Sequence, residues 1–536
     1  MKTKMNRRSF VSGAALGAGS ILGGAFHNAM AAGAKDSSAQ GPVASTTSGK
    51  IRGVVQENKV NAFRGVPYGA PTGGANRFMP PVKPEAWTGI KETIEWGPEA
   101  PQGPHTEIPE VAATIPKLSI SEDCLHLNVW TNALDARKRP VMLWLHGGGF
   151  TSGNGSYSMY DGANMAHKHD VVVVTINHRL NSFGFLYLAD IGGEKFKDAS
   201  NCGILDAVAA LEWVRDNIAN FGGDPNNVTI FGQSGGAGKV STLLAMPAAK
   251  GLFHRAIVQS GANLKGVSTE DATKTAHMLM EKVGVKTAEE LQMVPMDQLV
   301  SATLSTRGLR LAPVLDGKTL PSGPFDPTAP ALSSDVPLLI GSTEFEVNFF
   351  PNTKLDPIDD GELHAAVKQA TRADDAQVDK LIAVYRKGRP KASDIDLSQI
   401  IASDGFRSPV ITEAERKSEQ PAPVYMYYFT WKTPVHDGKL KAFHTLEIPF
   451  VLDNVDEAKS MTGSGADRYP LQDKMSGAWA AFARTGNPNH KGLPNWPVFK
   501  TDRRATMVFN NQCKVVNDPH GEERMALAEL RPPRRG

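Results

Sequence analysis

The sequence of 536 residues is long for one ordinary domain, and its composition, 41% hydrophobic and 21% charged, is typical of a globular protein. Its net charge of +2 gives no indication of a nucleic-acid or strongly acidic partner. The three cysteines allow at most one disulfide, and their spacing suggests no metal site.

The first 34 residues are typical of a bacterial twin-arginine export signal. Arg7 and Arg8 precede a modestly apolar, glycine- and alanine-rich stretch over residues 11–26. Two A-x-A patterns between residues 29 and 34 fit signal cleavage. The apolar stretch is too short and too rich in glycine for a membrane span. We therefore expect a periplasmic or secreted mature protein without a membrane span.

The remaining chain predicts a short polar linker over residues 35–48 and one large domain over residues 49–536. Residues 50–68 alternate like short strands, and the proline-rich residues 71–104 indicate irregular loops. Strand-like apolar runs follow at residues 125–130, 141–145, 171–176, 228–231, 256–259, 336–340 and 424–430.

Helical patterns separate most of these runs, for example over residues 205–221. Thr287 to Glu290 resembles a capping box that opens another helix. Strands that alternate with helices predict a mostly parallel sheet covered on both faces. Residues 351–420 predict helices over one end of that sheet.

The pattern G-x-S-x-G places Ser234 directly after the apolar run 228–231 and before the helix-compatible run 237–245. A strand, a sharp turn and a helix in this order form the context of a nucleophile elbow. A side chain at Gly232 or Gly236 would clash with the neighbouring strand and helix. The hydroxyl would be exposed at a helix N-terminus, which stabilises developing negative charge. Taken alone, the pattern is equally compatible with a simple glycine-rich turn.

A second motif, His-Gly-Gly-Gly over residues 146–149, follows the apolar run 141–145. Consecutive glycines free backbone N–H groups to point at a ligand. The N–H groups of Gly148, Gly149 and Gly235 would together form an oxyanion hole. A loop that is rich in glycine only for tight packing is the alternative, and the presence of both motifs favours the catalytic interpretation.

The chain resembles the type-B carboxylesterase family, the α/β hydrolases that include bacterial esterases and the cholinesterases. The likeness extends from about residue 49 to residue 499. Its motifs are FRGVPY at 63–68, EDCLHLNV at 122–129, NHRLNSFGFL at 177–186 and NFGGDP at 220–225. The resemblance implies an α/β-hydrolase fold: a central, mostly parallel twisted sheet flanked by helices, with a small N-terminal β element and helical insertions over the active site.

The resemblance also assigns two further catalytic groups. The family's acid corresponds to Glu346, and Glu344 is the alternative because the Asp and Gly that usually flank the acid are absent. The family's base corresponds to His444, whereas His436 lies nearby without the matching context. The chain order Ser234, Glu346, His444 is then nucleophile, acid and base.

Structural features follow from the same likeness. It implies ion pairs between Arg77 and Glu122 and between Arg179 and Asp206. It also implies that Cys124 is a free, buried thiol, since the family's partner cysteine is replaced by alanine.

Departures from the family pattern concern the substrate. Gln233 precedes the serine where the family usually has Glu, and Thr114 stands where cholinesterases have their choline-binding tryptophan. Both changes predict a weaker preference for cationic substrates. Gly235 replaces the usual Ala and still supplies a backbone N–H. By family analogy we expect a deep, mostly apolar pocket, with Gln233, Phe150, Phe406 and Phe443 as candidate substrate contacts.

The sequence therefore predicts a carboxylic-ester hydrolase that acts on a small-molecule ester through an acyl-enzyme, without metal or cofactor. The alternatives are a non-catalytic, cholinesterase-like binding protein and an amidase or lyase that uses the same serine. No motif indicates an oligomeric state.

Overall fold

The computed structural model describes residues 41–106 and 108–530. The predicted export signal lies outside these ranges. Part of the predicted linker forms β1 (Val43–Thr46), which pairs antiparallel with β2 (Gly49–Arg52). A third strand, β5 (Ile90–Glu92), joins β2 in parallel. All three residues of β5 are exposed, so this strand has no apolar run that would distinguish it from the loops predicted over residues 71–104.

Within the described residues, eleven strands form the main sheet, in the order β16–β15–β14–β13–β10–β9–β7–β8–β6–β4–β3. From β15 through to β8 in this order, each strand is parallel to the next one. The pairs outside this run, β16–β15 at one end and β8–β6, β6–β4 and β4–β3 at the other, are antiparallel. The bounds are β3 (Val54–Val55), β4 (Asn61–Pro67), β6 (His126–Thr131), β7 (Arg139–Leu145), β8 (Val172–Ile176), β9 (Gly223–Gln233), β10 (Arg255–Gln259), β13 (Leu338–Thr343), β14 (Val424–Phe429), β15 (Ala505–Phe509) and β16 (Lys514–Asn517). A separate pair consists of β11 (Val267–Ser268) and β12 (Val314–Leu315).

The central strands are buried on both faces, which explains their continuous apolar runs. Along β7 every residue is buried. Val141 and Leu143 belong to the core on one face, and Met142 and Trp144 to the core on the other. The sheet therefore separates two hydrophobic cores.

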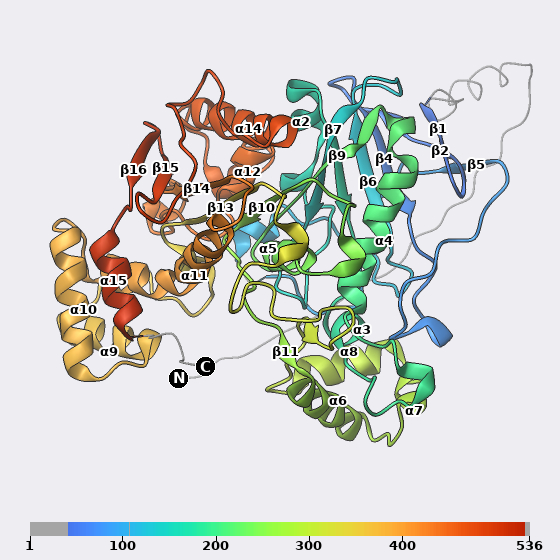
Figure 1. Cartoon of the computed structure of the whole chain (residues 1–536), viewed down its shortest axis with the longest axis horizontal. Helices are drawn as coiled ribbons and strands as arrows, with labels where there is room; N and C mark the ends of the chain where they lie inside the picture. The colour runs from blue at the N-terminus through green and yellow to red at the C-terminus, as the bar shows by residue number, and fades with distance from the viewer. Residues whose placement is uncertain (1–40, 107, 531–536) are drawn as a thin grey trace, which may run out of the picture. The chain divides into compact units, whose positions relative to one another are not determined.

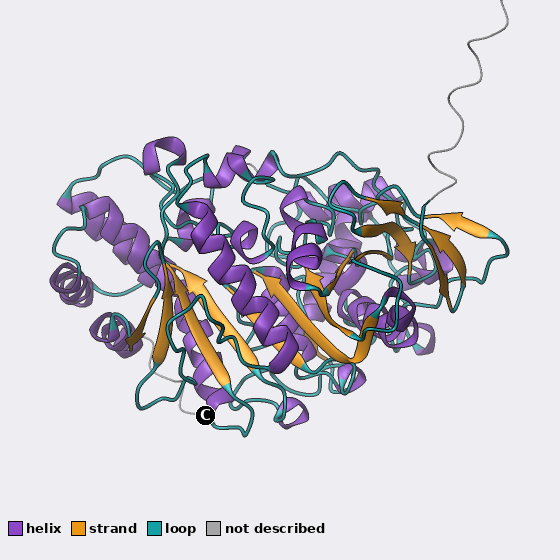
Figure 2. Cartoon of the chain, turned by 90° about the horizontal axis from the view of Figure 1, so that it is seen from above, coloured by secondary structure: helices purple, strands orange, loops and turns teal. Residues whose placement is uncertain are grey.

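Helices cover both faces of the sheet (Figure 1, Figure 2). Side chains of α4 and α5 contribute to the first core, and those of α12 and α14 to the second. The predicted helices of residues 351–420 are present as α9, α10 and α11. The bounds are α1 (Pro109–Ala112), α2 (Ala163–His169), α3 (Asn181–Phe185), α4 (Cys202–Asn217), α5 (Gly235–Leu243), α6 (Thr269–Val283), α7 (Ala288–Gln292), α8 (Met296–Ser305), α9 (Asp360–Thr371), α10 (Asp375–Gly388), α11 (Asp394–Ser418), α12 (Ile448–Val451), α13 (Lys459–Thr462), α14 (Arg468–Thr485) and α15 (Gly521–Leu530).

Some predicted boundaries shift for local reasons. The helix predicted over residues 205–221 begins at Cys202 and ends in a 3₁₀ turn, η5 (Ile218–Phe221), which Gly222 terminates with φ 76°. The strand predicted from residue 336 begins at Leu338, because Pro337 has no N–H to donate to the sheet. The capping box predicted at Thr287 and Glu290 is present at the start of α7.

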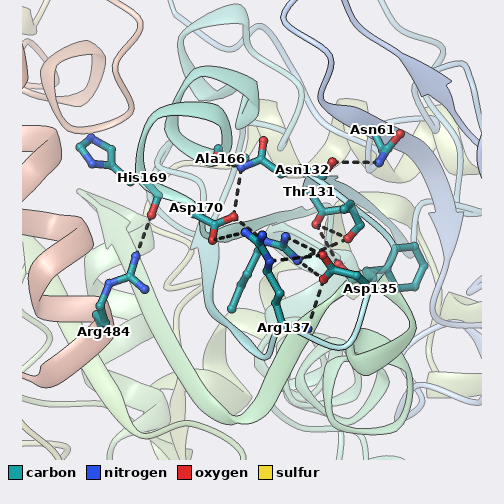
Figure 3. A network of polar contacts seen from close by, with 12 residues as sticks. Asn61, Thr131, Asn132, Asp135, Arg137, Ala166, His169, Asp170 and Arg484 are labelled. Atoms are coloured by element: carbon teal, nitrogen blue, oxygen red, sulfur yellow. Dashed lines mark hydrogen bonds and ion pairs between the residues drawn. The ribbon is translucent and has the colours of Figure 1, made fainter.

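Arg139 is the first residue of β7 and belongs to a polar network. Figure 3 labels Asn132, Asp135 and Asp170 of this network, and the Arg139 side chain contacts both aspartates. Its guanidinium donates to Asp135 at 2.5 and 3.0 Å and to Asp170 at 2.5 Å. The hydrogen bond from Arg139 lowers the pKa of the Asp135 carboxyl to about 2. Asn132 also donates to Asp170, at 3.2 Å. The strand that leads to the His-Gly-Gly-Gly motif is thus fixed at its beginning.

The two predicted ion pairs are both present. Arg77 Nε donates to Glu122 at 2.6 Å, and Arg77 Nη2 lies 2.5 Å from the other carboxylate oxygen. Arg179 and Asp206 form a fully buried pair in which Nε and Nη2 donate at 2.9 and 2.6 Å. All three cysteines are free, and burial raises the pKa of the Cys124 thiol.

The Asp206→Asn variant is expected to lose about 3–5 kcal/mol of unfolding free energy, because Arg179 would keep its charge without a buried partner. Equilibrium unfolding in urea measures this loss. The matched change at the exposed pair Lys274–Glu270, Glu270→Gln, should cost far less, because solvent screens an exposed ion pair. A similar small cost for both variants would contradict the assignment of a stabilising buried pair.

Candidate active site

The predicted site residues follow four parallel strands at one edge of the sheet. The carboxyl ends of parallel strands meet at a common edge, which is where α/β sheets hold their ligands. The His-Gly-Gly-Gly loop follows β7 and Ser234 follows β9. Glu346 follows β13 and His444 follows β14. The order of strands therefore gathers segments that are far apart in the sequence.

Ser234 lies on a sharp turn between β9 and α5. Its backbone has φ 57° and ψ −125°, an unusual conformation for a residue with a side chain. A Cβ on Gly232 would lie 2.6 Å from the carbonyl carbon of Gly236, and one on Gly236 would lie 2.0 Å from the Leu145 oxygen. The two glycines are thus required by the close approach of β7 and α5, while the serine itself carries the unusual backbone angles.

The glycine loop lies against this turn. Gly148 and Gly149 have φ values of 84° and 63°, which favour glycine. A Cβ on Gly147 would lie 3.5 Å from the Ser234 Cβ. A Cβ on Gly235 would lie 2.0 Å from the Gly149 oxygen. The structure therefore brings the two glycine motifs into direct contact.

His444 and Glu346 form a buried pair. The loops after β13 and β14 are joined by a parallel bridge between Phe345 and Phe443, which sets the two side chains side by side. His444 Nδ1 lies 2.5 Å from Glu346 Oε2, and the Thr343 N–H donates to Oε1 at 2.8 Å. His444 is 2% exposed and Glu346 is fully buried.

The alternative residues have other partners. Arg389 donates to Glu344 at 2.7 Å. His436 contacts Glu110, and more than half of its side chain is exposed. Glu346 and His444 are therefore the acid and histidine that the structure pairs with each other.

Two buried side chains complete the surroundings of this pair. The Gln233 amide nitrogen lies 3.3 Å from Nδ1 and 3.2 Å from Nε2 of His444. Burial, followed by the charge of Glu346, raises the pKa of Glu447 to about 8. Burial thus disfavours a second full negative charge beside Glu346.

Aromatic rings surround the histidine. The ring centroids of Phe406, Phe349 and Phe350 lie 5.2, 5.4 and 6.2 Å from that of His444. Phe350 also lines a cavity of about 610 Å³ between α9 and α11. Of these three rings only Phe406 is predicted by the sequence, although Phe349 and Phe350 directly follow the segment of the acid.

The two other candidate wall residues have different positions. Phe150 is partly buried and packs edge-on against Phe185 at 5.1 Å. Phe443 is fully buried in the second core. In this structure the Phe443 side chain therefore has no surface that a substrate could contact.

Among residues 41–106 and 108–530, no group of three or more His, Cys, Asp or Glu side chains is placed to hold a metal ion. None of the helices in the same ranges combines the length and apolar character needed to cross a bilayer.

The model of the Carboxylesterase family matches residues 40–527. The chain belongs to the carboxylesterase family. The para-nitrobenzyl esterase of Bacillus subtilis (strain 168) is 36% identical over 514 residues, which cover 90% of this chain and 98% of that protein. The liver carboxylesterase of Sus scrofa is 33% identical and covers 90% of this chain and 92% of that protein.

Solved structures give the same result. A carboxylesterase of Geobacillus stearothermophilus matches with a TM-score of 0.79 and 39% identity, over 90% of this chain and 99% of that one. An esterase of Clostridium hathewayi, described as able to hydrolyse aliphatic aromatic polyesters, matches with a TM-score of 0.78 and 33% identity, over 91% and 98% of the two chains. The fold is that of the α/β hydrolases, as predicted, and this family member is a carboxylic-ester hydrolase.

Proposed function

We propose that this carboxylesterase cleaves its ester through an acyl-enzyme formed on Ser234, with His444 as general base and acid and Glu346 as the residue that orients it. The buried contact of 2.5 Å between Glu346 and His444, at the sheet edge that also carries Ser234, is the observation that supports this proposal.

The hydrogen bond between Glu346 and Nδ1 decides what the imidazole can do. A carboxylate accepts, so Nδ1 carries the proton and Nε2 of the neutral ring keeps its lone pair. Nε2 takes the proton of the Ser234 hydroxyl as Oγ attacks the ester carbonyl carbon. The imidazolium then gives this proton to the leaving alcohol, and the acyl group stays on Oγ. In the second half of the reaction Nε2 takes a proton from water, which attacks the acyl carbon, and returns the proton to Oγ as the acid leaves.

The developing oxyanion would be bound by the N–H groups of Gly148, Gly149 and Gly235. The contact between the glycine loop and the start of α5 supports this role. The loss of one such donor typically raises the barrier by about 2.7–4 kcal/mol. The backbone rather than side chains would supply these donors.

Labelling by an organophosphonate tests the proposal. A fluorophosphonate should add one phosphonyl group to the native protein, and peptide mass spectrometry should locate it on Ser234. Failure to label, together with no turnover of p-nitrophenyl esters, would favour the non-catalytic binding protein instead. Turnover of an amide as fast as that of its matched ester would favour the amidase.

Charge discrimination by this site is expected to be weak. Gln233 places a neutral amide next to His444, and Thr114 is only 3% exposed and donates to the Val111 carbonyl of its own turn at 2.8 Å. Neither side chain has a carboxylate or an aromatic ring that could bind a cation.

We therefore expect butyrylcholine to be no better a substrate than 3,3-dimethylbutyl butyrate, which has the same shape without the charge. The ratio of their kcat/KM values measures this, and Gln233→Glu should shift it toward the choline ester. A strong preference of the wild type for butyrylcholine would contradict the prediction.

We also propose that residues 1–34 direct export through the twin-arginine pathway. Fractionation of a bacterial host should find the protein in the periplasm. The double change of Arg7 and Arg8 to Lys should retain it in the cytoplasm, and equal export of both forms would refute the assignment.

A further inference from the structure

Lys239 is a fully buried lysine in the middle of α5, one turn after the nucleophile elbow. Its Nζ donates to the carbonyl oxygen of His146 at 3.0 Å and to that of Gly149 at 3.1 Å. No ion pair joins it to a carboxylate among the described residues. Removing an ammonium group from water without a counter-charge destabilises the folded protein, so a lysine at this position calls for an explanation.

Two buried histidines lie close enough to this lysine to feel its charge. The rings of His146 and His178 stack with centroids 4.7 Å apart. Each Nδ1–H donates to a backbone carbonyl at 2.9 Å. Burial, and then the proximity of Lys239, lowers the pKa of both imidazoles. The surroundings therefore provide carbonyl acceptors and no anion.

The same environment affects the lysine. Burial lowers the pKa of Lys239 to about 7. A neutral amine has two N–H groups, which match the two carbonyl acceptors. The contact with the loop can thus be made with or without the additional proton.

The two acceptors bracket the glycine loop. The His146 oxygen belongs to the peptide that enters Gly147, and the Gly149 oxygen to the peptide that leaves the loop. Between them, Gly148 and Gly149 have positive φ values and no side chains. The Gly148 oxygen accepts from the backbone N–H groups of Thr151 and Ser152 at 3.2 and 3.1 Å, so this turn closes on itself between the two carbonyls that accept from Lys239. One amine tethers both ends of this segment to α5.

We propose that Lys239 is a positioning residue that holds residues 146–149 against α5, so that the N–H groups of Gly148 and Gly149 stay directed at the oxyanion. This inference rests on the oxyanion role proposed above.

The absence of a side chain at position 235 fits the same arrangement. The Gly149 oxygen, which accepts from Lys239, lies 2.0 Å from where a Gly235 Cβ would stand. The loop can approach α5 this closely only because position 235 is glycine. Gly235→Ala should therefore displace the same carbonyl that Lys239 holds.

Lys239→Met tests the role, because Met fills a similar volume without donors. We expect kcat/KM for p-nitrophenyl butyrate to fall about 10- to 100-fold, mainly through kcat, since a misplaced loop weakens binding of the transition state more than that of the substrate. A trifluoromethyl ketone, which forms an oxyanion on the nucleophile, should lose affinity by the same factor. Lys239→Gln retains two N–H donors on a shorter chain and should recover part of the loss.

Ser241→Ala is the matched control. Ser241 lies on the same helix and is buried, but its hydroxyl bonds to Glu413 at 2.8 Å on the side away from the loop. This variant should lose stability and keep kcat. The Gly235→Ala and Lys239→Met effects should be less than additive, because both displace the same carbonyl.

A Lys239→Met enzyme with wild-type kcat and wild-type affinity for the ketone would overturn the positioning role while leaving Ser234 chemistry intact. If the wild type itself neither turns over esters nor takes a phosphonate label, the proposed function fails instead.

The pH dependence of unfolding gives a readout that needs no activity. A lysine with a native pKa near 7 binds a proton on unfolding wherever the pH lies between that value and about 10.4. The wild type should thus gain stability as the pH rises through this range, more steeply than Lys239→Met. Equal slopes would show that the pKa of Lys239 is not lowered in the folded protein, and would contradict a buried amine without a counter-charge.

Discussion

The Ser234→Ala variant is expected to lose ester hydrolysis almost completely, with kcat about 10⁴- to 10⁶-fold below the wild type. The substitution removes the oxygen that would attack the carbonyl carbon and carry the acyl group. It leaves the backbone N–H groups of the glycine loop and of Gly235 in place, so only a small residual rate over water should remain. Initial rates with p-nitrophenyl esters from acetate to decanoate measure the loss, and the wild-type profile over chain length sizes the acyl pocket.

Ser158→Ala provides the control for this experiment. Ser158 lies in η3 (Ser158–Tyr160), between the glycine loop and α2 in the sequence, and its hydroxyl donates to the Glu457 carbonyl at 3.2 Å. The control should retain wild-type rates. Equal rates in the Ser234→Ala variant and the wild type would mean that another residue is the nucleophile.

The two glycine motifs could be predicted because each is a short pattern of residues that directly follows an apolar run. Backbone atoms of Gly236 and of Leu145 on the neighbouring strand β7 leave no room for a side chain at Gly232, and Leu145 leaves none at Gly236. Glycine is therefore required at both positions, and this requirement can be recognised in the sequence. The buried central strands could be predicted from the sequence as well, because a strand covered on both faces needs an uninterrupted apolar run.

The rest of the site depends on contacts between distant segments. Glu346 and His444 came from the family resemblance, because nothing local distinguishes Glu346 from Glu344. Only the pairing of Phe345 with Phe443 shows which carboxylate turns toward the histidine. Phe443 takes part in the same pairing, and its side chain is fully buried in the second core.

Lys239 illustrates the same difficulty. In the sequence it is one charged residue in a helix that could have faced solvent. Its importance arises from the carbonyls of a loop that lies about ninety residues earlier in the chain. Phe349 and Phe350 were missed for a related reason, since their rings acquire a role only through the position of His444.

The Glu346→Gln variant is expected to lower kcat about 10⁴-fold, the size of effect seen when the acid of a serine triad becomes an amide. The Thr343 N–H donates to Oε1 of this side chain at 2.8 Å, and a glutamine would keep that bond with its own oxygen. Its NH₂ group would then face His444 Nδ1 and donate to it. The imidazole would carry its proton on Nε2 and could no longer accept one from Ser234.

Glu344→Gln separates this electronic effect from a general loss of structure. Glu344 is a neighbouring, largely buried glutamate whose partner is Arg389 at 2.7 Å. Its amide variant should lose stability, because Arg389 would keep only Glu523 as a partner, and should retain kcat. If the Glu344 variant lost turnover and the Glu346 variant kept it, the acid would be Glu344. The two substitutions are chemically identical and two residues apart, so a difference in kcat between them can arise only from which carboxylate orients the histidine.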